Sequence, residues 1–253
     1  MAIIGSTQFL HPLCYSGHLW CIVWSMPYAI FGAGDIGCTV GVTLAACGES
    51  VTLIGRDSPT GKALRNAVTA GAVVLHTQSR WERRLSAAQC AGIFATDATQ
   101  LANAEVIFVA TKRLQNEAAA HAVGQHAQRG AIVVILQNGV GVADELRALL
   151  PAGRSDLQLV ECVVSVNAVR DLSGSGARFL WVSPRDQSNP AFVLSGKGAK
   201  VAEAMNRAGL IAVSTDELAD LAHAKLMLNC GMNAVNALSG IGLRQCIRDA
   251  GYR

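Results

Sequence analysis

Short apolar runs alternate with helical patterns over much of the chain, beginning at Tyr28. Continuous apolar runs cover residues 28–31, 51–54, 106–110 and 132–136. A helix of small and apolar residues is predicted after the first run, as far as Cys47, with Gly48 as its C-cap. Further helical patterns cover 114–126 and 141–149. Strands buried on both faces are unbroken apolar runs, and helices between them are typical of a parallel sheet. The pattern therefore predicts an α/β fold.

The second half of the chain departs from this alternation. Two extended runs, 157–166 and 177–182, are joined by a Gly/Ser-rich turn at 173–176, which favours an antiparallel addition to the sheet. Beyond the turn we predict a helix, a strand and one long helix, over residues 199–208, 211–214 and 217–238. The chain thus divides into a sheet-forming unit, 26–215, and a helical unit, 216–253.

The first 25 residues fit neither pattern. The sequence has no charged residue before Asp35 and no Lys or Arg before Arg56, so the basic start of a secretory signal is missing. The best apolar run, 19–24, is far too short to cross a bilayer. We predict that residues 1–25 form a poorly ordered leader, with Met26 as the natural beginning of the protein.

Composition narrows the class of protein. Apolar residues make up 51% of the chain and charged residues 15%, which excludes a disordered protein. The net charge is only +3, and the charged residues are scattered along the chain, which argues against a nucleic-acid partner. The eight cysteines form no C-x-x-C pair and the six histidines have no ligand spacing, so we expect no metal. Reduced thiols fit a cytoplasmic protein without a membrane partner.

The strongest local signal is the glycine-rich loop after the first strand. Gly32 permits a tight turn, Gly34 lets the backbone approach a pyrophosphate, and Gly37 allows close packing of helix on strand. The helix that follows presents N–H groups and the positive end of its dipole to phosphates. A loop of this kind between a strand and a helix indicates dinucleotide binding. The candidate cofactor-binding residues are Gly32, Ala33, Gly34, Asp35, Ile36 and Gly37.

The end of the second strand indicates which dinucleotide binds. NAD-binding chains usually carry Asp or Glu there, to bond the ribose 2′-hydroxyl, but this chain has Gly55-Arg56. Arginine offers a planar bidentate donor to a 2′-phosphate that a carboxylate would repel, so NADP(H) is the expected cofactor. The adjacent Asp57 works against this interpretation, and an exposed arginine at a strand end is the alternative.

Lys112 and Asn138 follow the third and fourth apolar runs. The carboxyl ends of strands in an open parallel sheet border the ligand crevice, so both side chains could contact ribose, phosphate or substrate. Each by itself could equally be a solvated loop residue. Their shared position with the glycine-rich loop favours a site.

A polar stripe marks the long C-terminal helix. Lys225, Asn229 and Asn233 recur every four residues, which places them along one face. They lie among apolar residues, and buried Lys and Asn are costly unless paired, so the stripe is a candidate site. A solvated face of an amphipathic helix is the alternative.

Taken together, these residues resemble the ketopantoate reductase (2-dehydropantoate 2-reductase) family. The matching pieces are IFGAGDIG, VTLIGR, the lysine after VAT, QNGVG and KLMLNCGMN, within residues 26–253. The resemblance implies a Rossmann-type NAD(P)-binding domain over 26–215 and an incomplete all-helical domain of the 6-phosphogluconate dehydrogenase-like kind over 216–253. It also implies NADPH-dependent reduction of ketopantoate to pantoate, a precursor of pantothenate and coenzyme A.

The resemblance assigns a role to each candidate. The glycine-rich loop would hold the pyrophosphate and Arg56 the 2′-phosphate, while Lys112 and Asn138 would line the cofactor and substrate cleft. Lys225 resembles the catalytic lysine that donates a proton to the ketone oxygen. Asn229 and Asn233 resemble the asparagines that orient a 2-oxo acid substrate. Donation from a positioned cation agrees with the charge that develops on a ketone oxygen during reduction.

The chain departs from the family at its end. Family members are longer and carry a substrate-binding glutamate and serine, which nothing after Asn236 matches. We therefore expect a C-terminally truncated chain that binds the cofactor but has weak or no turnover, and a helix whose apolar face is exposed or covered by a second subunit. The alternatives are a β-hydroxyacid dehydrogenase and a catalytically impaired NADP-binding module.

Overall fold

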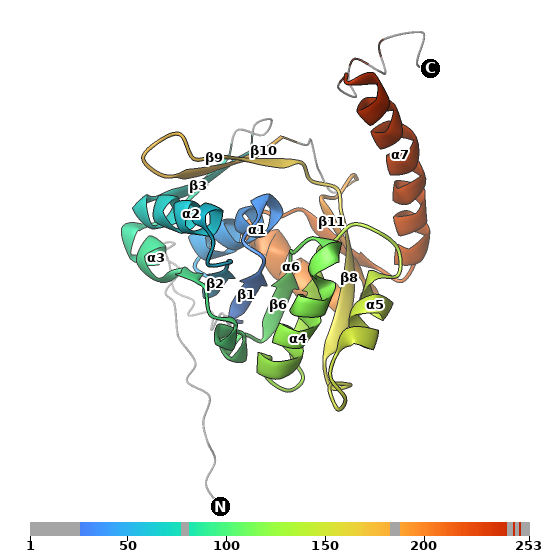
Figure 1. Cartoon of the computed structure of the whole chain (residues 1–253), viewed down its shortest axis with the longest axis horizontal. Helices are drawn as coiled ribbons and strands as arrows, with labels where there is room; N and C mark the ends of the chain where they lie inside the picture. The colour runs from blue at the N-terminus through green and yellow to red at the C-terminus, as the bar shows by residue number, and fades with distance from the viewer. Residues whose placement is uncertain (1–25, 77–80, 183–187, 242–244, 246–247, 249–253) are drawn as a thin grey trace, which may run out of the picture.

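The structure, a computed structural model, describes residues 26–76, 81–182 and 188–241, together with 245 and 248. The predicted leader, 1–25, lies outside the described residues. Within them, most of the chain belongs to a twisted sheet with helices on both faces (Figure 1).

Eight strands form the main sheet in the order β12-β11-β8-β7-β6-β1-β2-β5. Their bounds are β1 Tyr28–Phe31, β2 Val51–Ile54, β5 Phe94–Ala95, β6 Val106–Val109, β7 Ile132–Ile135, β8 Gln158–Val164, β11 Phe192–Ser195 and β12 Ala212–Thr215. All neighbouring strands are parallel except β8 and β11. The four apolar runs predicted as strands lie side by side as β7-β6-β1-β2. The strand order reverses between β1 and β6, which is where open sheets of this kind bind ligands.

Helices pack on both faces of this sheet because each of its central strands is apolar on both sides. The helix α1 (Asp35–Ala46) and α6 (Ala199–Ala208) share one hydrophobic core with the sheet. The 3₁₀ helix η1 (Ala98–Asn103), α4 (Asn116–His126) and α5 (Val142–Leu149) form the other core. The predicted α/β architecture is confirmed.

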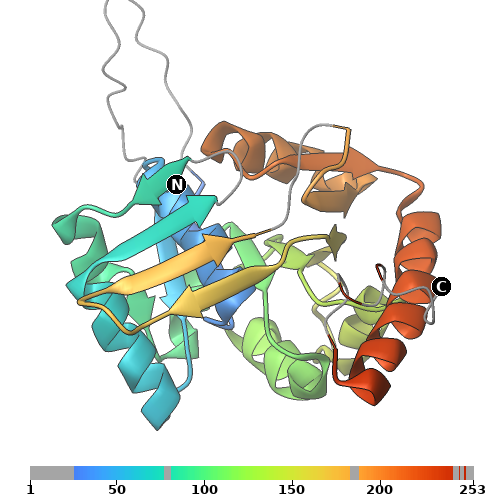
Figure 2. The same cartoon turned by 90° about the horizontal axis from the view of Figure 1, so that it is seen from above.

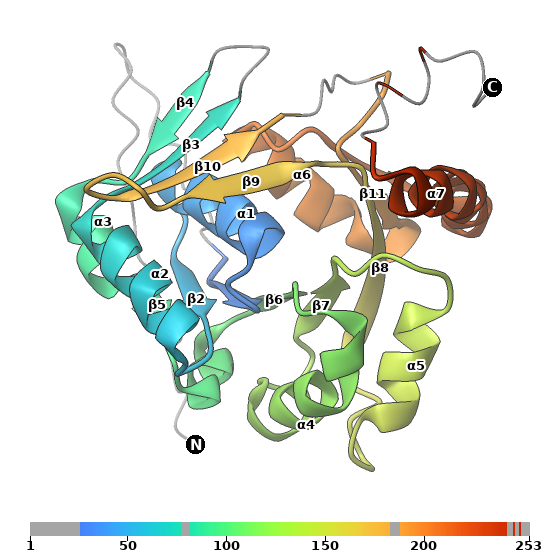
Figure 3. The ribbon, with the colours of Figure 1, turned by 45° about the horizontal axis from the view of Figure 1, so that its top comes forward.

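A second sheet covers α1 on the side away from the main sheet (Figures 2 and 3). Its order is β4-β3-β10-β9, with bounds β3 Ala72–His76, β4 Glu82–Arg84, β9 Ala168–Asp171 and β10 Ala177–Trp181. The helices α2 (Pro59–Ala70) and α3 (Ala87–Gly92) lie beside it. As a result, every residue of α1 from Gly37 to Ala45 is buried.

The predicted antiparallel addition to the main sheet is wrong. The strand β8 pairs with β7 and β11, whereas β10 pairs with β9 and β3 in the second sheet. The turn at 173–176 joins β9 to β10, not β8 to β10. The physical reason is that Ala177, Phe179 and Trp181 alternate inward along β10 and need an apolar surface, which α1 supplies.

The helix α7 (Leu218–Ser239) stands at the edge of the molecule and contacts β8 and β11 (Figure 1). Among its residues only Leu218 is fully buried, and several large apolar side chains are exposed: Leu221, Leu226, Met227, Leu228 and Leu238. The expectation of a long helix with an exposed apolar face is met. In the described part of the chain, no helix has the length and apolar character needed to span a membrane.

Candidate functional site

The glycine-rich loop fits tightly against its neighbours at two of its three glycines. Gly32 has φ +110°, and a Cβ there would lie 2.7 Å from the backbone nitrogen of Thr111. A Cβ on Gly37 would lie 2.3 Å from the carbonyl oxygen of Gly32. By contrast, a Cβ on Gly34 would have no atom within 4 Å. The loop is therefore closed toward the sheet and open at Gly34.

The open side of the loop coincides with the start of α1. Gly34 is the N-cap residue and no side chain caps the helix, so its first N–H groups remain available to an anion. Ala33 and Ile36 are partly buried against the core, which leaves their backbone as the part that could meet a ligand. Asp35, in the first turn, lies 3.1 Å from Arg170 of β9.

A cleft of about 710 Å³ lies beyond this loop. Phe31 and Gly32, at the end of β1, line it together with Ile54, Gly55 and Arg56, at the end of β2, and residues of η1 and α4. Arg56 is exposed at this cleft. Asp57 lies 3.4 Å from Lys62 and forms an ion pair with it. Neither residue lines the cleft. A volume of this size suits a small-molecule ligand.

The structure brings Lys225 and Asn138 together from opposite parts of the chain. The Nζ atom of Lys225, on α7, donates to Oδ1 of Asn138 at 2.5 Å. The same Nζ donates to the carbonyl oxygen of Val164, the last residue of β8. A cationic nitrogen is thus held at the carboxyl edge of the sheet, after β7 and β8, by neutral oxygen acceptors.

The remaining candidates are less tightly grouped. Asn229 lines the same small hollow as Lys225 and Asn138, and both helix residues are half-buried. Asn233, one turn further along α7, is exposed. Lys112 is exposed at the start of the 3₁₀ helix η2 (Arg113–Gln115), and its backbone N–H donates to Gln115 Oε1 at 3.3 Å.

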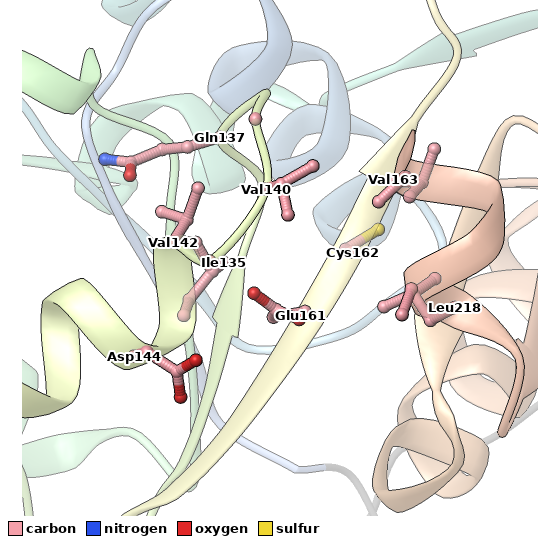
Figure 4. Close-up of a pocket in the computed structure, with 13 residues that line it drawn as sticks. Ile135, Gln137, Val140, Val142, Asp144, Glu161, Cys162, Val163 and Leu218 are labelled. Atoms are coloured by element: carbon pink, nitrogen blue, oxygen red, sulfur yellow. The ribbon is translucent and has the colours of Figure 1, made fainter. Parts of the chain in front are cut away.

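A second hollow continues from the first toward the start of α7 (Figure 4). Both hollows are lined by Gln137, Cys162 and Val163, so they form one cleft. The carboxylate residues Glu161 and Asp144 also line the second hollow. Glu161 Oε1 accepts from the backbone N–H of Ala143 at 3.1 Å, at the N-terminus of α5, where negative charge is favourable.

Sequence patterns missed a set of side chains that hold the turn carrying Asn138. Arg113 Nε lies 2.6 Å from Glu145 Oε2, and Asn116 Nδ2 donates to the other oxygen of Glu145 at 2.9 Å. These two donors lower the pKa of Glu145. A Cβ on Gly139 would lie 2.9 Å from the Arg113 guanidinium, so that side chain packs directly on the turn.

The signals available for these missed residues differ. Thr111 and Gln137 follow neighbouring parallel strands, and Gln137 Nε2 donates to Thr111 Oγ1 at 3.0 Å. The pairing of these two strands would have been enough to place the two residues near each other. The Arg113–Glu145 pair joins residues 32 positions apart on separate elements, and Val164 contributes a backbone carbonyl, so neither has a local signal.

We expect Cys162 to be unreactive although it lines the cleft. The side chain is 4% exposed, and burial raises the pKa of its thiol to about 12, against a smaller lowering by Lys225. Because the thiolate is the reactive form, iodoacetamide at pH 8 should modify Cys162 at least about 100-fold more slowly than the exposed Cys230. Peptide mapping by mass spectrometry measures both rates in one sample. Equal labelling would contradict the buried placement of Cys162.

Comparison with known proteins gives consistent matches. A family model described as ketopantoate reductase PanE/ApbA matches residues 28–175. A 2-dehydropantoate 2-reductase of Pyrococcus horikoshii is 26% identical over 213 residues, 84% of this chain and 64% of the relative. One of Halobacterium salinarum is 29% identical over 220 residues, 85% and 66% of the two chains. The chain thus spans a little under two thirds of the length of these curated relatives.

A solved structure agrees with the sequence matches. The crystal structure of a PanE/ApbA family ketopantoate reductase from Ralstonia eutropha superposes with a TM-score of 0.69 at 27% identity. The match covers 90% of this chain and 69% of that one. The similarity therefore extends through the main sheet and beyond the range of the family model.

Proposed function

The chain belongs to the ketopantoate reductase PanE/ApbA family, and from that premise we propose that it reduces 2-dehydropantoate (ketopantoate) to pantoate with NADPH. The observation that carries the proposal is the contact of Lys225 Nζ with Asn138 Oδ1. It holds a proton donor at the same edge of the sheet as the glycine-rich loop. Oxidoreductase chemistry on a ketone needs both a loop that holds the cofactor and a positioned proton donor.

The residues present fit a dinucleotide. Gly34 leaves the space that a pyrophosphate needs for close approach, and the start of α1 offers uncapped N–H groups. Arg56 lies at the cleft in which a 2′-phosphate would sit, and Asp57 is paired with Lys62. When bound, NADPH supplies the hydride that reduces the carbonyl carbon. NADP(H) rather than NAD(H) is the proposed cofactor because of Arg56.

The chain's own residues would then handle the charge and the proton. Reduction of a ketone places negative charge on its oxygen, and the Lys225 ammonium would stabilise that charge and give up a proton from Nζ. Asn138 and the carbonyl of Val164 orient Nζ by accepting its hydrogen bonds. Asn229, in the same hollow, would bond the polar groups of a 2-oxo acid, and Asn233 would extend that row. Lys112 would meet the cofactor from the end of β6.

One titration tests the proposal. The purified chain is titrated with NADPH and with NADH, and ketopantoate is then added while NADPH absorbance is followed. Oxidation that depends on ketopantoate, even at the weak rate expected from the sequence, supports the reductase. Oxidation of 3-hydroxy acids with NADP⁺, and none with ketopantoate, would assign a β-hydroxyacid dehydrogenase instead. Selective NADPH binding without turnover would overturn the reductase and leave an NADP-binding module.

Arg56→Gln should remove the preference for NADPH. The loss of a charged bidentate partner for a phosphate is expected to weaken NADPH binding about tenfold to 100-fold, while NADH binding changes less than about threefold. Calorimetric titration measures both dissociation constants. Arg129→Gln is the matched control, because it removes an exposed arginine that does not line the cleft and should leave the ratio unchanged. Equal loss for both cofactors in Arg56→Gln would contradict the assigned role.

The proposed setting follows from the proposed reaction. A pantoate-forming reductase serves pantothenate and coenzyme A biosynthesis in the cytoplasm. We also propose a homodimer, since α7 leaves Leu226, Met227 and Leu228 exposed and a second subunit would cover them.

A further inference from the structure

Asp35 is an unexpected residue for an anion site. It occupies the first turn of α1, beside the open face of Gly34. A carboxylate at a helix N-terminus is favourable by itself, but here it shares the helix end that the diphosphate of the proposed cofactor would approach. Two negative groups at one helix end repel each other, so the loop needs a further positive charge to accept the cofactor.

Arg170 supplies that charge from another part of the fold. Its Nε atom lies 3.1 Å from Asp35 Oδ1, and the two side chains are 33% and 40% exposed. Asp35 Oδ1 is itself buried and accepts no hydrogen bond from the residues that the structure describes. The Arg170 guanidinium is therefore a close positive partner of an otherwise unsatisfied carboxylate oxygen.

The second sheet fixes the position of Arg170. The residue lies on β9 directly opposite Phe179 of β10. Opposite residues of an antiparallel pair share one face of the sheet, and Phe179 is fully buried in the core that contains α1. Arg170 is thus held on the face that covers α1, at the end of that helix where the glycine-rich loop lies.

We propose that Arg170 is a positioning residue that neutralises Asp35 so that the glycine-rich loop accepts the cofactor diphosphate. The inference rests on the proposed binding of NADPH. It assigns to the second sheet a part in cofactor binding: β9 supplies the compensating charge. An exposed ion pair with a merely structural role would contribute little to stability and nothing to the choice among phosphate ligands.

Fragments of the cofactor separate these roles. Calorimetric titrations use NADPH, 2′,5′-ADP and 2′-AMP, since the first two carry a phosphate that reaches the loop and 2′-AMP does not. Arg170→Gln should weaken NADPH and 2′,5′-ADP at least tenfold and change 2′-AMP less than twofold. In Asp35→Asn/Arg170→Gln, removal of the uncompensated carboxylate should restore both affinities to within threefold of the wild-type chain.

Controls make each outcome decisive. Arg178→Gln removes an arginine of β10 that pairs with Asp171 at 3.4 Å, and should leave all three affinities unchanged. Arg170→Lys keeps the charge and should bind normally even if Arg170→Gln folds poorly. Unchanged NADPH binding in Arg170→Gln, or a double variant as weak as Arg170→Gln, would overturn the inference while the proposed function stands. A wild-type chain that binds none of the three probes would overturn both.

Discussion

Lys225→Ala should lower kcat for ketopantoate reduction by about 10²- to 10⁴-fold, the range expected for loss of a positioned proton donor. The same change should leave the dissociation constant of NADPH within about twofold, because Lys225 contacts Asn138 and Val164, beyond β7 and at the end of β8. Steady-state kinetics and calorimetric titration on one preparation measure the two quantities.

A matched lysine shows whether charge alone matters. Lys200, on α6, is exposed and lines neither of the hollows near Lys225. Lys200→Ala should therefore have wild-type kinetics. A Lys225→Ala variant that retained more than a tenth of the activity would remove the lysine from the proposed chemistry. The family assignment would survive that result, since it rests on the match over residues 28–175.

Gly37→Ala and Gly34→Ala should damage the protein in opposite ways. At Gly37 a Cβ would lie 2.3 Å from the backbone oxygen of Gly32, so α1 must move away from the loop. We expect a loss of about 3 kcal/mol in the free energy of unfolding, near the top of the range for overpacking. At Gly34 the φ of −91° suits any residue and the space is empty, so the free energy should change by less than about 0.5 kcal/mol.

Gly34→Ala, the variant with the smaller loss of stability, should show the clear loss of NADPH binding. The methyl group of Gly34→Ala would occupy the space through which the pyrophosphate approaches, so NADPH binding should weaken at least about tenfold. Urea unfolding and calorimetric titration of both variants give the comparison. If Gly34→Ala bound NADPH normally, the open face of the loop would not be the phosphate site.

The parts of the fold that could be predicted are those whose residues carry a complete local pattern. β1, β2, β6 and β7 are apolar on both faces, and a strand of that kind must lie inside a sheet. The strands of the second sheet have a weaker local pattern. β4 is Glu82–Arg84, three charged residues at its edge, and β9 carries both Arg170 and Asp171. Their pairing depends on covering α1, which no short window of sequence contains.

The candidate site follows the same rule. Asn138 and Lys225 could each be proposed separately, one from the end of a strand and one from a helical stripe. That they touch across 87 positions is a property of the packed chain. The partner of Asp35 was beyond reach for the same reason, since Arg170 lies on β9, a strand that the sequence pattern did not predict.

The burial of α1 between two sheets determines how late during synthesis this helix can be covered. The helix is complete at Ala46, but the strands that cover its outer side end at Asp171 and Trp181. More than half of the protein must therefore leave the ribosome before the helix is enclosed. Until then its apolar side chains are open to water or to other chains, a state that favours aggregation. A chaperone that binds nascent chains would find a target here, in a helix whose apolar residues are buried in the folded protein.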